Sequence, residues 1–149
     1  MKSISLLATL LTLNLMASPA WSQADAVLAK AAAEKGAVKT DSGLVYRSLK
    51  DGTGAAPSAT DVVKVHYRGT FPDGREFDSS IARGQPAEFP LNRVIKCWTE
   101  GVQRMKVGGK ARLTCPAGIA YGDKGAGNVI PPNATLLFDV ELLGIAGSK

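Results

Sequence analysis

Four segments of this chain alternate apolar and polar residues with a period of two, and this pattern constrains the fold most. They cover residues 44–49, 63–68, 110–115 and 136–143. A period of two gives a β-strand one apolar face, which must be buried against another element. Pro72 and Gly74 are turn residues after the second segment, and they predict a hairpin to a fifth strand over residues 75–79.

Only one segment of the central body repeats apolar residues at helical spacing. Its residues are Val94, Trp98, Gly101, Val102 and Met105. Asn92 is a suitable N-cap for this helix, and Gly108 and Gly109 would end it. One helix and an antiparallel sheet predict an α+β fold, in which a five-stranded antiparallel half-barrel wraps around one short helix.

The first 22 residues have the pattern of a secretory signal peptide. Lys2 precedes an apolar run over residues 4–16, and small residues follow the run up to Ala20. The run is too short to cross a bilayer comfortably, and a buried helix or a signal anchor is the alternative. The pattern predicts a cleaved leader over residues 1–22, with cleavage after Ala20 or after Ser22, and export to an oxidising compartment.

The remaining chain divides into a short arm and one domain. Residues 23–41 are rich in alanine and lysine, which favours a short helix ended by Gly36. The apolar residues of this segment are mostly small, so we expect a helical arm or a linker. Residues 42–149 are expected to form one domain, and a chain of this size can bury its own core without a metal.

Composition excludes several kinds of site. His66 is the only histidine, and Cys97 and Cys115 are the only cysteines, so a histidine metal centre and a thiolate zinc cluster are excluded. His66 lies on the polar face of its predicted strand and is expected to be a surface histidine. The 18 Lys and Arg against 13 Asp and Glu are scattered, which argues against a nucleic-acid partner. We expect no metal, no cofactor and no stable membrane insertion.

Five aromatic residues are spread over the body, and most point to the inside of the predicted sheet. They are Tyr67, Phe77, Trp98, Tyr121 and Phe138. Such a group is often only the packed core, although tyrosine and tryptophan carry polar tips that need partners. An apolar hollow with a few polar groups is the usual form of a small-ligand site. The residues therefore predict either a core or a pocket at the open end of the sheet.

Five stretches of the sequence resemble the FKBP-type peptidyl-prolyl cis-trans isomerases, in family order and at family spacing. They are residues 63–70 (VKVHYRGT), 73–80 (DGREFDSS), 94–101 (VIKCWTEG), 120–122 (AYG) and 130–142 (IPPNATLLFDVEL). The resemblance runs from about residue 42 to residue 145 and is to a short secreted bacterial form. It implies the half-barrel described above and a pocket between helix and sheet that binds proline-containing polypeptides.

The resemblance also implies roles for individual residues. Trp98 is the floor on which a proline ring rests, and Tyr121 offers its hydroxyl to the substrate carbonyl. Asp78 lies at the rim, where Tyr67 and Arg83 hold it. The implied catalytic residues are Tyr67, Asp78 and Tyr121. The implied substrate-binding residues are Phe77, Arg83, Val94, Ile95, Trp98, Val129, Ile130 and Phe138.

Three positions depart from the family pattern that the sequence resembles. Ala87 stands where many members have an aromatic residue, and Ala126 stands where some have histidine. Both changes are expected to make the pocket shallower. Cys97 replaces a frequent glycine just before Trp98.

A site of this family needs no nucleophile and no cofactor, because rotation about an X–Pro bond breaks no bond. Amide resonance opposes the rotation with a barrier of about 18–20 kcal/mol. A dry apolar pocket disfavours the planar, charge-separated amide relative to the twisted transition state. Tyr121 and the backbone N–H of Ile95 can hold the carbonyl meanwhile. Asp78 would either favour the twisted form of the substrate amide or only hold the side chains of Arg83 and Tyr67 in position.

The two cysteines can form a disulfide. Cys97 lies on the flank of the predicted helix, and Cys115 ends the inward face of a strand that must pack against that helix. In an oxidising compartment we expect the pair to be bonded, and two buried free thiols are the alternative.

Taken together, these features and the resemblance predict a peptidyl-prolyl cis-trans isomerase of the bacterial periplasm that assists the folding of exported proteins. The alternative is a non-catalytic chaperone or binding module for proline-containing segments. The resemblance implies macrolides such as rapamycin as inhibitors. Longer family members dimerise through an N-terminal helical region, and the short arm over residues 23–41 leads us to expect a monomer.

Overall fold

The structure is a computed structural model and describes residues 20–146 of the chain. The leader predicted over residues 1–22 lies outside the described residues, apart from the backbone of the first turn of helix α1 (Ala20–Ala32). The boundaries predicted at residues 22 and 41 stay predictions.

One antiparallel sheet of seven strands forms the body of the described chain. Its strands are β1 (Ala37–Lys39), β2 (Val45–Lys50), β3 (Val62–Thr70), β4 (Glu76–Ser79), β5 (Ala87–Pro90), β6 (Lys110–Cys115) and β7 (Leu136–Ala146). The order across the sheet is β1-β2-β6-β7-β3-β4, and β5 pairs with the start of β3 on the same edge as β4. The other helices are α2 (Ser80–Arg83) and α3 (Lys96–Gln103), with 3₁₀ turns η1 (Leu91–Arg93) and η2 (Ala117–Ile119).

The predicted α+β fold is confirmed. The four strands expected from alternation correspond to β2, β3, β6 and β7, and the strand expected after the hairpin turn corresponds to β4. The alternation does not predict β1 and β5, because strands of three and four residues are too short to show a period. Pro90 at the end of β5 is typical of a sheet edge.

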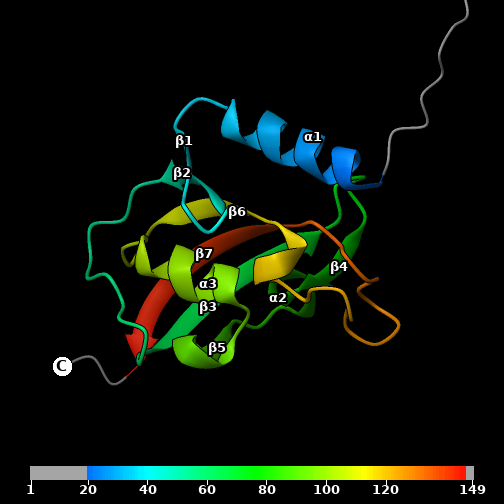
Figure 1. Cartoon of the computed structure of the whole chain (residues 1–149). Helices are drawn as coiled ribbons and strands as arrows, with labels where there is room; N and C mark the ends of the chain where they lie inside the picture. The colour runs from blue at the N-terminus through cyan, green and yellow to red at the C-terminus, as the bar shows by residue number, and fades with distance from the viewer. Residues whose placement is uncertain (1–19, 147–149) are drawn as a thin grey trace, which may run out of the picture.

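The helix α3 lies over the concave face of the sheet (Figure 1). Alternation along the strands places large apolar side chains on this face. Val63, Val65 and Tyr67 of β3 are buried on this face, whereas Lys64 on the outer face is exposed. Register shifts in the pairing of β3 with β7 and β4 mark bulges, which bend a strand and increase its twist. The bent sheet wraps around α3 as a half-barrel.

The helix α3 is shorter than its apolar pattern predicts. No side chain caps its first turn, so the prediction that Asn92 is its N-cap is wrong. Asn92 lies in η1 instead, because the buried Leu91 turns the chain before the helix begins. The helix ends at Gln103, before the predicted stop at Gly108 and Gly109, since its last turn closes with tighter 3₁₀-type hydrogen bonds.

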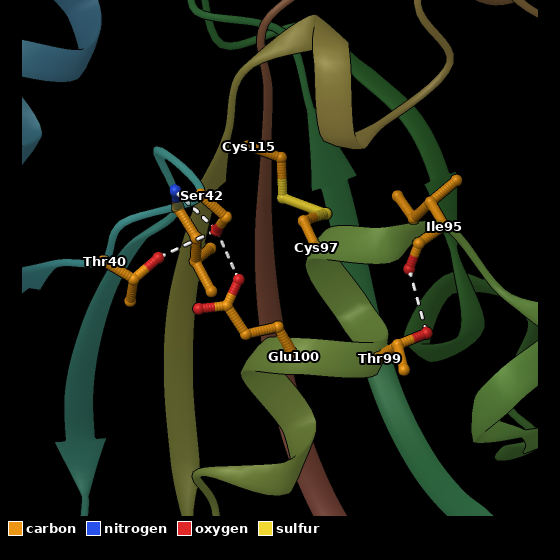
Figure 2. Close-up of a disulfide and its surroundings, with 8 residues drawn as sticks. Thr40, Ser42, Ile95, Cys97, Thr99, Glu100 and Cys115 are labelled. Atoms are coloured by element: carbon orange, nitrogen blue, oxygen red, sulfur yellow. Dashed lines mark hydrogen bonds between the residues drawn. A yellow bond between two sulfur atoms is a disulfide. The ribbon is translucent and has the colours of Figure 1, made fainter. Parts of the chain in front are cut away.

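A disulfide joins α3 to the end of β6 (Figure 2). Cys97 and Cys115 are both fully buried, and their Cα atoms lie 5.9 Å apart. One turn further along α3, a Cβ on Gly101 would lie 2.8 Å from Cδ2 of Leu113, so glycine allows the helix to approach the strand this closely. The predicted disulfide is confirmed, and the alternative of two free thiols is wrong.

The N-terminal arm docks on the outer face of the sheet, opposite α3. The helix α1 contacts β1 and β2, and Val45 and Thr114 are buried although they point to this outer face. Arg47 holds the arm by an ion pair with Glu34 (2.5 Å) and by a hydrogen bond from its Nε to the Lys35 carbonyl (3.1 Å). The described part of the arm is therefore packed on the domain.

The double substitution Cys97→Ala with Cys115→Ala is expected to lower the free energy of unfolding by about 3 kcal/mol, because the disulfide closes a loop over a sequence separation of 18. Urea titration followed by circular dichroism measures this difference. Dithiothreitol should lower the stability of the wild type similarly and leave the double variant unchanged. A double variant as stable as the oxidised wild type would contradict the expectation.

Candidate active site

A cavity of about 340 Å³ lies between α3 and the concave face of the sheet. Aromatic walls come from strands, helix and loop: Tyr67, Phe77, Phe89, Trp98, Tyr121 and Phe138. The remaining lining residues are Asp78, Arg93, Val94 and Ile95. This volume lies within the usual range for a small-ligand site, and the mix of apolar walls with a few polar groups is typical of one.

Trp98 forms the floor of the cavity and is held rigidly by other rings. It is only 4% exposed although it lines the cavity. Tyr67, Phe89 and Phe138 stand nearly perpendicular to the indole, with ring centroids 5.2, 5.6 and 5.5 Å away. These edge-to-face contacts are favourable and resist rotation of the indole. The floor is therefore already in place without a ligand.

Gly69 on β3 makes room for two of the aromatic walls. A Cβ at this position would lie 2.5 Å from Cζ of Phe77 and 3.1 Å from Cε1 of Phe138. The two rings therefore rest directly on the backbone of β3, and their planes meet at 87°. A larger residue at Gly69 would force the Phe77 ring out of its present position.

A hydrogen-bonded group of three side chains stands at the rim. The Tyr67 hydroxyl donates a short hydrogen bond to Oδ2 of Asp78, and Arg83 donates from Nη1 to Oδ1 of the same carboxylate. Arg83 also donates from Nη2 to the Tyr67 hydroxyl at 3.0 Å, and its guanidinium lies 5.7 Å from the centre of the Tyr67 ring. Both oxygens of Asp78 are thus occupied.

The rim group sets the protonation of its members. Burial raises the pKa of Asp78, but the hydrogen bonds from Tyr67 and Arg83 and the Arg83 charge outweigh it, and the net pKa lies below the ordinary 3.8. Burial and the hydrogen bond to Asp78 raise the pKa of the Tyr67 hydroxyl above its ordinary value. At neutral pH, Asp78 is therefore a carboxylate and Tyr67 a neutral donor.

The helix α2 carries Arg83 to the rim. Ser79 caps this single turn by accepting the backbone N–H of Ala82 (3.1 Å), and Gly84 ends it in the left-handed conformation. The next residue, Ser80, is fully buried, and its Oγ accepts the backbone N–H of Tyr67 at 2.7 Å. The hydrogen bond between Ser80 and Tyr67 thus connects α2 to β3, the strand that carries Tyr67.

His66 has a structural partner and lies outside the cavity. Its Nδ1 is 2.9 Å from Oγ of Ser80, and the ring is half-buried on the outer face of β3. The prediction that His66 is a satisfied histidine on the polar face is confirmed. Because the hydroxyl of Ser80 is fully buried, this pair cannot act on a substrate.

Tyr121 approaches the cavity from the loop between η2 and β7. Within residues 20–146 its hydroxyl makes no hydrogen bond, so it is available as a donor. Burial and the negative charge of Asp78 raise the pKa of Tyr121, which keeps this hydroxyl protonated. The loop backbone folds closely on itself: Gly125 has φ +67°, and a Cβ there would lie 2.2 Å from the Ile130 carbonyl oxygen.

The structure brings together eight of the eleven residues that the sequence predicts for the site. They are Tyr67, Phe77, Asp78, Val94, Ile95, Trp98, Tyr121 and Phe138. Arg83 stands behind Asp78 at the rim. Ile130 packs into the core beneath the loop, and Val129 is 57% exposed beside it, so neither lines the cavity. The individual roles of these residues stay predictions.

Two lining residues are missing from the sequence prediction. Phe89 lies on β5, whose four residues are too few to establish a period from the sequence alone. Arg93 lies in η1, where a single exposed arginine carries no pattern. The alternation of Ala87 and Phe89 with Glu88 and Pro90 is the sequence signal that could have found Phe89. Nothing in the sequence marks Arg93.

The described residues show neither a metal-binding cluster nor a helix that could cross a membrane. Within residues 20–146 no three His, Cys, Asp or Glu side chains gather as a metal would need. Each helix in the described part of the chain is too short or too polar to span a bilayer.

The stability contributed by the rim group is expected to depend on pH. Because the pKa of Asp78 is lowered in the folded protein, its contribution is present above about pH 4 and is lost as the pH falls through the folded pKa. Asp78→Asn should therefore be less stable than the wild type at pH 7, by about 0.5–1 kcal/mol since the side chain is 40% exposed. Urea titrations at pH 7 and at a strongly acidic pH should show this gap closing as the pH falls through the folded pKa of Asp78. A gap of the same size at both pH values would show that the charge of Asp78 is irrelevant.

Comparison with known proteins places this geometry in a family. The family model of the FKBP-type peptidyl-prolyl cis-trans isomerases matches residues 54–143. The isomerase FkpA of Aeromonas hydrophila is 59% identical over 118 residues, which cover 79% of this chain and 44% of that protein. The FKBP-type 22 kDa isomerase of Escherichia coli is 54% identical over 114 residues, 76% of this chain and 55% of that protein.

Solved structures agree with these sequence matches. The crystal structure of FkpA from Escherichia coli has a TM-score of 0.81 at 46% identity and covers 84% of this chain and 58% of that one. A peptidyl-prolyl cis-trans isomerase from Pseudomonas syringae has a TM-score of 0.78 at 38% identity and covers 83% of this chain and 91% of that one. The chain spans about half the length of the curated relatives it matches. By its motifs, its half-barrel and these matches, the chain belongs to the FKBP-type peptidyl-prolyl cis-trans isomerase family.

Proposed function

We propose that this chain catalyses cis–trans rotation about X–Pro bonds at the cavity over Trp98. The observation that carries the proposal is a preformed aromatic cavity that combines the apolar floor Trp98 with the free hydroxyl of Tyr121. Relatives that share this part of the chain are named as isomerases, which supports the same reaction here.

The walls suit a proline ring. The ring is apolar and rigid, so it loses little entropy when it rests on Trp98 between Phe77, Phe89 and Phe138. Each methylene removed from water contributes about 0.8 kcal/mol. Binding the ring in this way anchors one side of the X–Pro bond and leaves the other side to turn.

The polar groups suit the carbonyl before proline. Tyr121 has a free hydroxyl, and among the described residues the backbone N–H of Ile95 has no backbone hydrogen-bond partner. A donor that holds the carbonyl oxygen while the cavity excludes water favours the twisted amide over the planar one. Each 1.4 kcal/mol of such preference is about a tenfold gain in rate.

Asp78 acts in this proposal through its neighbours. Both of its oxygens accept hydrogen bonds from Tyr67 and Arg83, so it holds Tyr67 as a wall and supplies a fixed negative charge at the rim. A charge fixed beside a cavity that excludes water can interact with the dipole of the substrate amide, and it does not have to reorient during the reaction. Tyr67, Asp78 and Tyr121 are the proposed catalytic residues, with Arg83 in support.

The biological setting is proposed from the sequence and the disulfide. The leader pattern over residues 1–22 and the Cys97–Cys115 bond both suit an oxidising compartment such as the periplasm. We propose that proline-containing segments of exported proteins are the substrates and that macrolides such as rapamycin compete for the cavity. A monomer is proposed because the described arm packs on its own sheet.

The direct test is cis–trans exchange of a Leu-Pro peptide measured by NMR with catalytic amounts of protein, with and without rapamycin. Exchange should be faster with protein, and rapamycin should abolish the gain. Trp98→Leu should lower kcat/KM at least about tenfold, a loss of about 1.4 kcal/mol in transition-state binding. Tyr46→Phe is the matched control, since Tyr46 lines a different hollow.

The alternative, a binding module without turnover, predicts a different outcome of the same experiment. Macrolide or peptide binding with unchanged exchange would favour it. If the protein neither binds the macrolide or the peptide nor speeds up exchange, the proposal that this cavity is the site is contradicted.

A further inference from the structure

Arg93 is the one charged group of the cavity lining that lacks a partner within residues 20–146. The lining holds two charged side chains, Asp78 and Arg93. Asp78 is paired with Arg83. No ion pair among the described residues includes Arg93, and its guanidinium makes no hydrogen bond there. The lining therefore presents one uncompensated positive charge.

The backbone that carries Arg93 is held firmly beside the cavity. Leu91, two residues earlier, is fully buried, and its N–H donates to the carbonyl of Asp61 at 2.9 Å. The carbonyl of Leu91 accepts the Thr99 hydroxyl of α3 at 2.6 Å. Arg93 is exposed but stands on this fixed turn, and the exposed Lys96 at the start of α3 adds a second positive charge.

Negative side chains on the surrounding elements do not offset this charge. Glu88 of β5 points away from the cavity, because it alternates with Phe89, and Lys64 stands opposite it in the sheet. Asp123 and Lys124 follow Tyr121 on the loop and have opposite signs. The mouth of the cavity is therefore positive on the side of Arg93.

We propose that Arg93 makes this cavity select proline segments that carry a carboxylate side chain on a residue next to the proline. The inference rests on the proposed function and names a substrate class for the same site. A guanidinium binds a carboxylate with several N–H donors, which suits a flexible acidic side chain beside an anchored proline ring. For an exposed pair the expected preference is about two- to fivefold in kcat/KM, and it falls with salt.

The test compares glutamate with glutamine, which have the same shape and differ in charge. Peptides with blocked ends carry Glu or Gln either before or after proline, and NMR exchange gives kcat/KM for each at low ionic strength. The wild type should prefer Glu about two- to fivefold in at least one of the two positions. The preference should vanish in about 0.5 M salt and in Arg93→Gln, and it should reverse in Arg93→Glu.

Two further variants sharpen the result. Arg93→Lys keeps the charge and should keep most of the preference. Lys106→Gln removes one positive charge from an exposed position away from the cavity, and it should leave the Glu-to-Gln ratio unchanged.

Two outcomes would overturn the inference alone: equal rates for Glu and Gln in both positions, or a preference that Arg93→Gln retains. If a variant does not fold, the inference is still tested in the wild type, because a Glu preference that depends on the Arg93 charge must fall with salt. Absence of catalysis on every peptide would instead overturn the proposed function and this inference with it. The two failures are therefore distinguishable.

Discussion

The packing of α3 against the concave face of the sheet is the contact on which the rest of the structure depends. The helix has only eight residues and no capping side chain, so it could not hold its place alone. Gly101 lets it press against Leu113, and the buried Cys97–Cys115 disulfide holds its first turn to β6 (Figure 2). Glu100 accepts a short hydrogen bond from Ser42, which ties the same helix to the segment before β2. Because Trp98 lies within this clamped stretch, the floor of the cavity is as rigid as the core.

A rigid cavity suits a reaction in which the protein supplies surroundings and no reacting group. Rotation about an X–Pro bond needs an anchor for the ring, donors for the carbonyl and the absence of water. The aromatic rings around Trp98 provide the anchor for the ring, and Tyr121 lies where its hydroxyl can donate to the carbonyl. Asp78, Tyr67 and Arg83 form a closed group whose members satisfy one another, so a charge persists at the rim without disturbing the fold.

The parts of this architecture that follow from periodicity were predictable, and those that depend on single turns were not. Long alternating runs such as residues 136–143 predict a strand and its buried face, and they recover four of the seven strands. The turn residues Pro72 and Gly74 add β4 as a fifth. The short β5 has no such signal, and Phe89 was missed with it. Asn92 fits the cap of α3 by residue type, but the burial of Leu91 decides where the helix begins. The place of Arg93 in the cavity could not be predicted, because its importance depends on which charged side chains the fold brings close to it.

The central claim is that a proline ring rests on Trp98 in the cavity between α3 and the sheet. The most direct measurement is a set of intermolecular NOEs between the indole protons of Trp98 and the ring protons of proline in a bound Leu-Pro peptide. The account predicts NOEs from the proline ring to Trp98 and to the neighbouring rings of Phe77 and Phe138. Proline NOEs to the outer face of the sheet or to α1, with none to Trp98, would contradict it.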